Sequence, residues 1–148
     1  MTYTLIGSTT LASAASSVTF SSITQDYRDL VLVVSANRSA YVQINGDTGA
    51  NYPYVFIYGL ISGTSTFAGA SANTSTSFVF YSESVVQIFD YSATDKHKSV
   101  LNRSGSSTIV EARANSWANT DAVTSLLIYA NVDTFDTGST FYLYGIAG

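Results

Sequence analysis

Cysteine is absent from the 148 residues of this chain, and charged residues are scarce. The lack of cysteine excludes disulfides, thiolate zinc sites and cysteine nucleophiles. A chain of this length can bury a core without such cross-links. Charged side chains make up 11% of the sequence, against roughly 25% in an average domain, so hydroxyl and amide groups must form most of the polar surface.

The sequence also lacks a basic stripe and a long apolar run. Its formal net charge of −4 repels phosphate backbones on average, so we expect no nucleic-acid binding. No apolar run approaches the roughly 18 residues of a membrane helix, so we expect no membrane partner.

Strong helix formers are few, whereas the chain holds 11 Tyr, 8 Phe and many Val, Ile and Thr residues that favour strands. Short apolar runs alternate with Ser, Thr, Asn, Gly and Asp, a rhythm typical of sandwiches and barrels. We therefore predict one all-β domain over residues 1–148, an antiparallel two-sheet sandwich of jelly-roll type. The predicted strands are 2–7, 16–23, 29–37, 40–45, 53–61, 77–81, 85–91, 98–103, 107–115, 122–132 and 139–146.

Local signals refine this prediction. The run Leu30–Val34 is apolar at every position, which predicts a central strand covered on both faces. Asn45-Gly46 predicts a type I′ hairpin turn, because that turn needs positive φ at both central residues. Asp136–Gly138 predicts a second turn. The small polar residues of 62–77 predict a long exposed loop.

Six phrases, in order along nearly the whole chain, resemble a family of small tailed-phage virion proteins. They are Val18–Ile23, Tyr27–Leu32, Asn45–Asp47 with Asn51-Tyr52, Lys98–Val100, Trp117–Asn119 with Ala122–Leu126, and Gly138–Ile146. The chain departs from the family pattern in the 62–77 segment and at Asp95–His97. The resemblance implies a virion structural protein on a β-sandwich, without saying which part of the virion it occupies.

The candidates for catalysis are few. His97 is the only histidine and lies in a polar, charged turn, whereas nucleophilic catalysis needs a buried, oriented base. Glu83 and Glu111 are the only glutamates, so a glycosidase pair would require both. Glu111 and Arg113 alternate onto one strand face, which favours an ion pair or a cross-strand contact. We therefore expect no enzymatic activity and no catalytic residues.

Two segments carry oxygen side chains in a pattern that calcium loops share. Residues 45–51 have oxygen ligands at alternate positions, but lack the acidic density and the terminal bidentate Glu of an EF-hand. Asn131, Asp133 and Asp136 invite the same comparison. We expect turns at both places, with no metal and no cofactor.

Tyrosines are the best interface candidates, because their amphipathic rings suit half-buried sheets and subunit contacts. Alternation places Tyr52, Tyr54 and Tyr58 on one face of a single strand. On the last strand it places Tyr142 and Tyr144 on one face, and Phe141 and Leu143 on the other. Trp117 is read as a core or interface anchor. The expected interface residues are Tyr52, Tyr54, Tyr58, Trp117, Tyr142 and Tyr144.

These observations lead to two functional hypotheses. The first is a capsid decoration (cement) protein on the outer surface of a phage head, whose partners are the major capsid protein and copies of itself, expected as a homotrimer. The second is a tail-tip or fibre-head module that binds host-surface carbohydrate through its tyrosines. Copy number per virion separates them, since a head carries hundreds of copies of a decoration protein and a tail only a few to tens.

Overall fold

The computed structural model describes residues 2–60, 66–71 and 77–148, which form twelve strands and no helix. No helix in this part of the chain could therefore span a membrane. The strands are β1 (Tyr3–Thr10), β2 (Ser17–Phe20), β3 (Asp29–Ser35), β4 (Ala40–Ile44), β5 (Tyr54–Leu60), β6 (Thr66–Ser71), β7 (Phe78–Phe80), β8 (Glu83–Ile88), β9 (Lys98–Gly105), β10 (Ile109–Trp117), β11 (Leu126–Ala130) and β12 (Thr140–Ile146). Each of the eleven predicted strands overlaps one of these.

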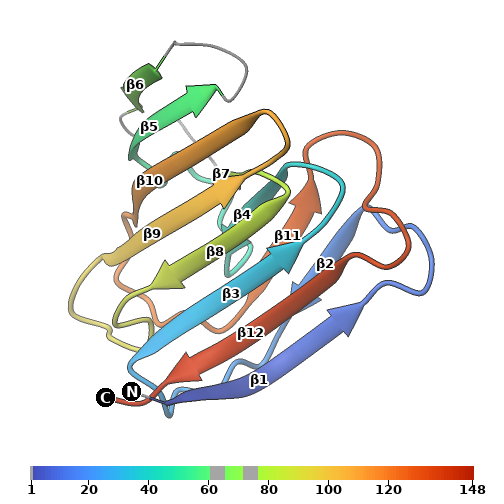
Figure 1. Cartoon of the computed structure of the whole chain (residues 1–148). Coiled ribbons are helices and arrows are strands. Elements are labelled where there is room, and N and C mark those ends of the chain that lie inside the picture. Colours follow the sequence, from blue (N-terminus) through green and yellow to red (C-terminus); the bar gives the residue numbers. More distant parts are fainter. Residues whose placement is uncertain (1, 61–65, 72–76) are drawn as a thin grey trace.

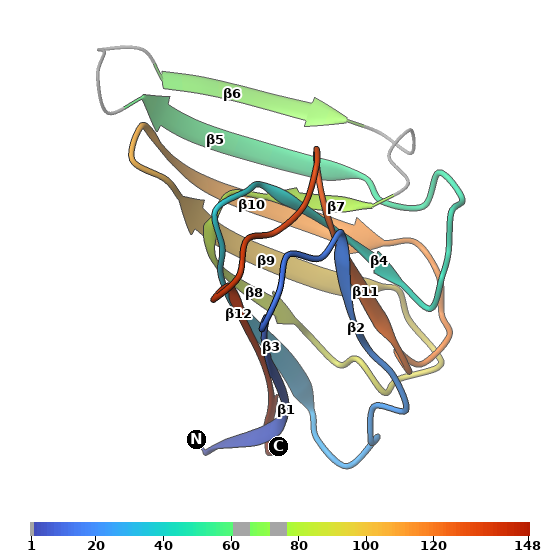
Figure 2. The same ribbon diagram turned by 90° about the vertical axis from the view of Figure 1, so that its right-hand side faces the viewer.

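The strands form an eight-stranded sheet, β1-β12-β3-β8-β9-β10-β5-β6, and a four-stranded sheet, β2-β11-β4-β7 (Figures 1 and 2). Four antiparallel pairs are nested along the chain: β1 with β12, β2 with β11, β3 with β8, and β4 with β7. Such nesting is the wrapped double hairpin of a jelly roll. The predicted fold class, an antiparallel two-sheet sandwich of jelly-roll type, is confirmed.

Two insertions enlarge the jelly roll on one side only. The β5–β6 hairpin interrupts the chain between β4 and β7, and the β9–β10 hairpin interrupts it between β8 and β11. Both join the large sheet beyond β8, so Figure 1 shows β6 at one edge of that sheet and β1 at the other. The large sheet is therefore twice as wide as the sheet that covers its inner face.

The core lies between the inner faces of the two sheets. Alternation along the strands directs every second side chain inward, as with Val42 and Ile44 of β4, Leu126 and Ile128 of β11, and Leu143 of β12, all of which are buried. Phe135 and Phe141 meet edge to face, with ring centroids 5.1 Å apart.

The prediction that β3 is covered on both faces is half wrong. Leu30, Leu32 and Val34 point into the core, but no second layer of described residues covers the opposite face. Val31 is only 4% exposed there because the side chains of its register partners, Tyr144 and Gln87, flank it. Neighbours within the sheet therefore give the strand its second apolar face.

Asn45 and Gly46 form the predicted turn, with φ of 53° and 68° and a 2.8 Å hydrogen bond from Asp47 N to Ile44 O. The turn does not make a hairpin, because β4 and β5 belong to different sheets. The second predicted turn is confirmed: Gly138 has a φ of 89°, and Ser139 N donates to Asp136 O.

The prediction of one long loop over 62–77 is wrong at its centre. Residues 66–71 form β6, which pairs with β5 along its length. The remainder of the predicted loop, 62–65 and 72–76, lies outside the described residues, whereas Ser77 is buried. Removing residues 64–75 would therefore delete an edge strand of the large sheet as well as connecting chain.

Tyr27 packs flat against the last strand. A Cβ added at Gly145 would lie 2.3 Å from Cγ and Cδ2 of the Tyr27 ring, closer than any real contact. Glycine is therefore required at this position by the close approach of the ring.

Candidate functional site

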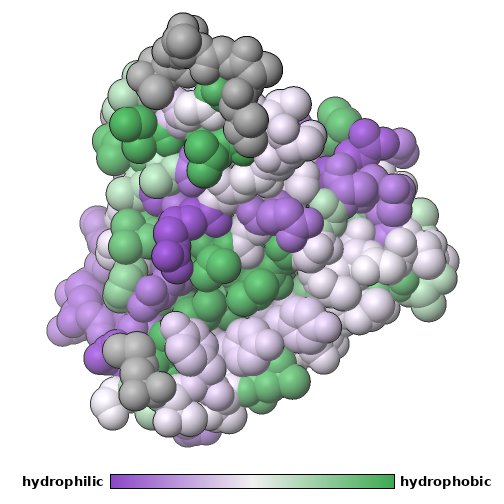
Figure 3. Space-filling view, in the orientation of Figure 1, coloured by the Kyte–Doolittle hydropathy of each residue, from purple (hydrophilic) through white to green (hydrophobic). Residues whose placement is uncertain are grey.

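The side of the eight-stranded sheet that faces away from the small sheet, called the outer face here, carries most of the exposed apolar surface. Six of the eight large hydrophobic side chains most exposed among the described residues lie on it: Tyr3, Leu5, Val55, Ile57, Leu101 and Val110. The space-filling view of this face shows hydrophobic side chains over its centre and one side (Figure 3). Large exposed apolar side chains gathered on one face of a sheet are typical of a binding interface.

One side of the outer face is a tyrosine strip, formed by Tyr3, Tyr142 and Tyr144. The rings of Tyr142 and Tyr144 stack with centroids 6.3 Å apart, and Tyr3 meets Tyr144 edge-on at 6.3 Å. The predicted alternation of β12 is confirmed, because Phe141 and Leu143 are fully buried on the opposite side. The two β12 tyrosines named as interface candidates are therefore half-buried and accessible to a partner.

The other side of the outer face contains a trough along β10. Ala112 and Ala114 form its floor, because their side chains are small. Their register partners stand higher on both flanks: Ile57 and Val55 on β5, Arg103 and Leu101 on β9. The hollow has a volume of about 600 Å³.

Arg103 is the only cation among the described residues on the flanks of the trough. It is exposed, and its guanidinium forms no hydrogen bond or ion pair with any residue in the described part of the chain. Glu83, two strands from the trough, accepts a 2.9 Å hydrogen bond from Ser35 Oγ. The trough therefore offers an apolar surface with one unsatisfied positive charge.

Tyr54 and Tyr58 lie on the inner side of the same sheet, as alternation predicts. With Phe56 between them they form an aromatic ladder, with centroid distances of 5.9 and 5.7 Å. The Arg113 guanidinium lies 4.6 Å from the Tyr54 ring centroid and 5.1 Å from that of Phe56. These two interface candidates thus belong to an aromatic and cationic cluster, away from the outer face.

The predicted Glu111–Arg113 ion pair is confirmed. Arg113 Nη2 lies 2.7 Å from Glu111 Oε2, and Nε lies 3.0 Å from Oε1, with both residues buried. Glu83 is on the outer face and Glu111 on the inner face, so the sheet separates the two carboxylates. They cannot flank one glycosidic bond.

Tyr52 and Trp117 must be removed from the interface candidates, because both are fully buried within the protomer. Tyr52 also precedes β5 and does not share a strand face with Tyr54. Its hydroxyl donates to Asp47 O at 2.9 Å and accepts from Ile44 N at 3.1 Å. Burial raises the pKa of Tyr52 to about 12.

Asp47 organises the loop that was compared with a calcium site. Its carboxylate accepts hydrogen bonds from Trp117 Nε1 at 2.7 Å, Gly49 N at 2.8 Å and Asn51 Nδ2 at 3.0 Å. The oxygens thus bind the chain's own donors. Asp133 lies 3.6 Å from Arg38, and the described residues contain no group of three or more His, Cys, Asp or Glu that could hold a metal.

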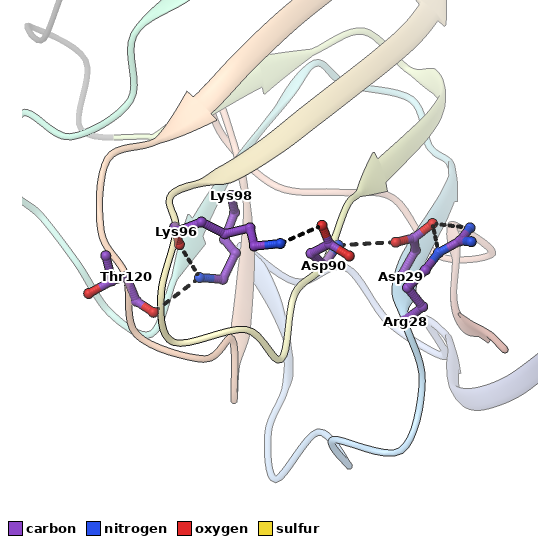
Figure 4. Close-up of polar contacts among 6 residues, drawn as sticks. All are labelled: Arg28, Asp29, Asp90, Lys96, Lys98 and Thr120. Atoms are coloured by element: carbon purple, nitrogen blue, oxygen red, sulfur yellow. Dashed lines mark hydrogen bonds and ion pairs between the residues drawn. The ribbon is translucent and has the colours of Figure 1, made fainter. Parts of the chain in front are cut away.

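The end of the sandwich around His97 is held by buried polar groups (Figure 4). Asp29, 1% exposed, accepts hydrogen bonds from Arg28 Nη2 at 2.9 Å and Asp90 N at 3.0 Å. The fully buried Lys98 donates to the carbonyls of Lys96 and Thr120 at 2.9 and 3.2 Å, and burial lowers its pKa. His97 is exposed beside these contacts, as predicted, with no buried environment to orient it.

Acid should destabilise the fold through Asp29 and Asp47. Burial alone would raise both pKa values. Hydrogen bonds outweigh the effect of burial and hold both pKa values below the usual range. Those to Asp29 come mainly from Arg28 and the Asp90 backbone, and those to Asp47 come mainly from Asn51 and Trp117. A lowered folded-state pKa contributes stability above the unfolded value of about 3.9, and this contribution is lost as the pH falls through the folded value.

We therefore expect the difference in unfolding free energy between the wild type and Asp47→Asn to shrink below about pH 4. Urea titrations at pH 6 and across pH 2–4 measure it, with Asp136→Asn as the control for loss of an exposed carboxyl. A difference that is constant across this range would show that the Asp47 hydrogen bonds do not favour the ionised form.

Sequence reasoning missed the trough and Arg103. Alternating Ala112 and Ala114 were visible, but their flanks come from β5 and β9, and the pairing of β10 with the distant β5 has no local signal.

Comparisons of the chain with models of known protein families and with curated proteins found no match.

Proposed function

We propose that this chain is a non-enzymatic structural protein of a tailed-phage virion, a decoration protein on the outer surface of the head. The observation that carries the proposal is the outer face: a broad sheet surface of aliphatic and tyrosine side chains with little charge. Interfaces enrich aromatic residues and exclude charge in the same way. The six phrases that resemble phage virion proteins supply the virion context.

The proposed mechanism is mass action. A protein that binds only the assembled shell stabilises that shell, by about 2.7 kcal/mol per site at a hundred times its dissociation constant. The proposed partners are the major capsid protein, through the tyrosine strip, and further copies of the same chain. The role requires no cofactor, nucleic acid or membrane.

Replacing Tyr142 and Tyr144 together by Ser should weaken binding to stripped phage heads about thirtyfold or more. Each aromatic ring buried in a contact contributes on the order of 1–3 kcal/mol, and 1.4 kcal/mol is tenfold in affinity. Occupancy on the heads, read by gel or cryo-EM across a protein titration, measures the effect.

The matched control is the double variant Tyr41→Ser/Tyr129→Ser. These two tyrosines also stack, with centroids 5.3 Å apart, but on the outer side of the small sheet. They should leave head binding unchanged. Equal binding by the wild type and the Tyr142/Tyr144 variant would contradict the proposed contact, and a wild-type copy number of only a few to tens per particle would contradict the head location.

The stacked Tyr41–Tyr129 pair is also the observation that favours the second candidate, a tail-tip or fibre-head module that binds carbohydrate. Paired, half-buried rings offer a flat apolar platform on which sugar C–H surfaces could stack, and Tyr129 is fixed by a 3.2 Å hydrogen bond with Ser77. If the Tyr41/Tyr129 variant loses glycan-array binding and cell adsorption while head binding is absent in the wild type, this candidate replaces the first.

A further inference from the structure

The loop between β11 and β12 carries side chains that are complementary to those of the β10 trough. Val132 is 60% exposed, the largest fraction among the exposed large hydrophobic side chains of the described residues. It is followed by Asp133, whose side chain is 70% exposed. In Figure 2 the orange-red segment between β11 and β12 rises to a projecting point. An aliphatic side chain and a carboxylate are therefore exposed at consecutive positions of this loop.

We propose that the trough of one copy receives this loop from a second copy, with Val132 on the alanine floor and Asp133 paired with Arg103. The inference rests on the proposed assembly role and names the self-contact within it. The complementarity is of two kinds. An exposed aliphatic group meets an apolar hollow of about 600 Å³, and an unpartnered cation meets a carboxylate.

Asp133 is available for such a contact. Its ion pair with Arg38 is long, 3.6 Å, and both side chains are substantially exposed, 42% and 70%. An exposed pair of this kind contributes little to stability, so exchanging it for a more enclosed partner costs little. Arg103 gives up no partner on binding, since it has none among the described residues.

The contact joins two different surfaces, so it is heterologous, and its repetition gives a ring if the rotation between copies closes and an open filament if it does not. A closed ring of three agrees with the homotrimer expected under the decoration hypothesis. The tyrosine strip on β1 and β12 lies at the far side of the outer face from the trough and stays uncovered for the shell. The two proposed contacts therefore use separate parts of the same sheet.

Charge reversal tests the pairing. Arg103→Glu and Asp133→Arg should each weaken self-assembly roughly a hundredfold, because each places like charges opposite one another. The double variant Arg103→Glu/Asp133→Arg restores opposite charges and should assemble as the wild type does. Light scattering after size-exclusion chromatography across a concentration series measures the mass, and a thermal melt verifies that each variant is folded.

Two matched controls isolate the contact. Asp136→Arg changes the net charge as Asp133→Arg does, on the same exposed loop, and should leave the oligomer intact. Thr137→Asp and Val132→Asp each add one carboxylate to an exposed position of the same loop, so a general effect of surface charge would be the same in both. Val132→Asp should abolish assembly, because it puts a second carboxylate into the apolar hollow.

A monomeric wild type, a two-fold dimer, or a double reversal that fails to reassemble would each overturn the inference. Head binding is scored separately. A trimer that does not bind stripped heads would refute the decoration role and leave the self-contact standing, whereas a wild-type monomer that binds heads would refute only the self-contact.

Discussion

Replacing Glu111 by Leu lowers the free energy of unfolding by about 3–5 kcal/mol, because the Arg113 guanidinium is left buried without its carboxylate. The two side chains are only 1% and 8% exposed, so water cannot take over the lost hydrogen bonds. Two aromatic rings remain against the guanidinium, but a cation–π contact of about 1–2 kcal/mol does not replace two charge-assisted hydrogen bonds.

The control is the double variant Glu111→Leu/Arg113→Met, which removes both charges and keeps comparable volume. It should recover most of the loss, since replacing a buried ion pair by packed apolar side chains is often neutral or stabilising. Urea unfolding at pH 7 measures both variants. A double variant as unstable as Glu111→Leu would mean that this buried site does not accept apolar side chains in place of the ion pair.

The second large effect is expected at Gly145. Replacing it by Ala should lower the unfolding free energy by about 3 kcal/mol, because the new methyl group would overlap the Tyr27 ring at 2.3 Å. The overlapped atoms include Cγ, which is close to the backbone and cannot swing away. Either Tyr27 leaves its place or the end of β12 moves.

A double-mutant cycle identifies the cause. In a Tyr27→Ala background the ring is gone, and Gly145→Ala should then cost less than about 1 kcal/mol. The coupling between the two changes is the quantity of interest, and thermal or urea unfolding supplies it. An equal cost of Gly145→Ala in both backgrounds would place the strain in the backbone of β12 and not in the ring contact.

The fold was predictable because most of its strands show local sequence patterns, namely β-forming residues and alternating side chains. Alternation placed Glu111 with Arg113, and Phe141 with Leu143, on the correct sides of their strands. The missed strand, β6, contains Ala68, Gly69 and Ala70, residue types that are depleted in strands. Its existence depends on β5, because a flat hydrogen-bonded edge accepts a segment that would not form a strand alone.

The candidate site was less predictable because burial is a tertiary property. Tyr52 and Tyr54 look alike in the sequence, but Tyr52 is held in the core by contacts with the turn after β4. Trp117 is buried in the core, where its indole donates to Asp47, seventy residues earlier in the chain. The outer face depends on which strands become neighbours, so Arg103 and the trough emerge only when β5, β9 and β10 are placed side by side.

The nested pairing of the jelly roll also determines when the protein can fold during synthesis. β1 pairs with β12, with Tyr3 opposite Ile146, so β1 has no partner strand until β12 has been made. β3 likewise remains open on one edge until β12 arrives. Contacts so distant in sequence make folding slow, because the entropy of closing long loops is lost before the contacts compensate for it. On the ribosome, β1 has no partner strand and β3 keeps one open edge until β12 emerges, whereas the β9–β10 hairpin is the unit best able to form early, since its two strands are joined by a short turn.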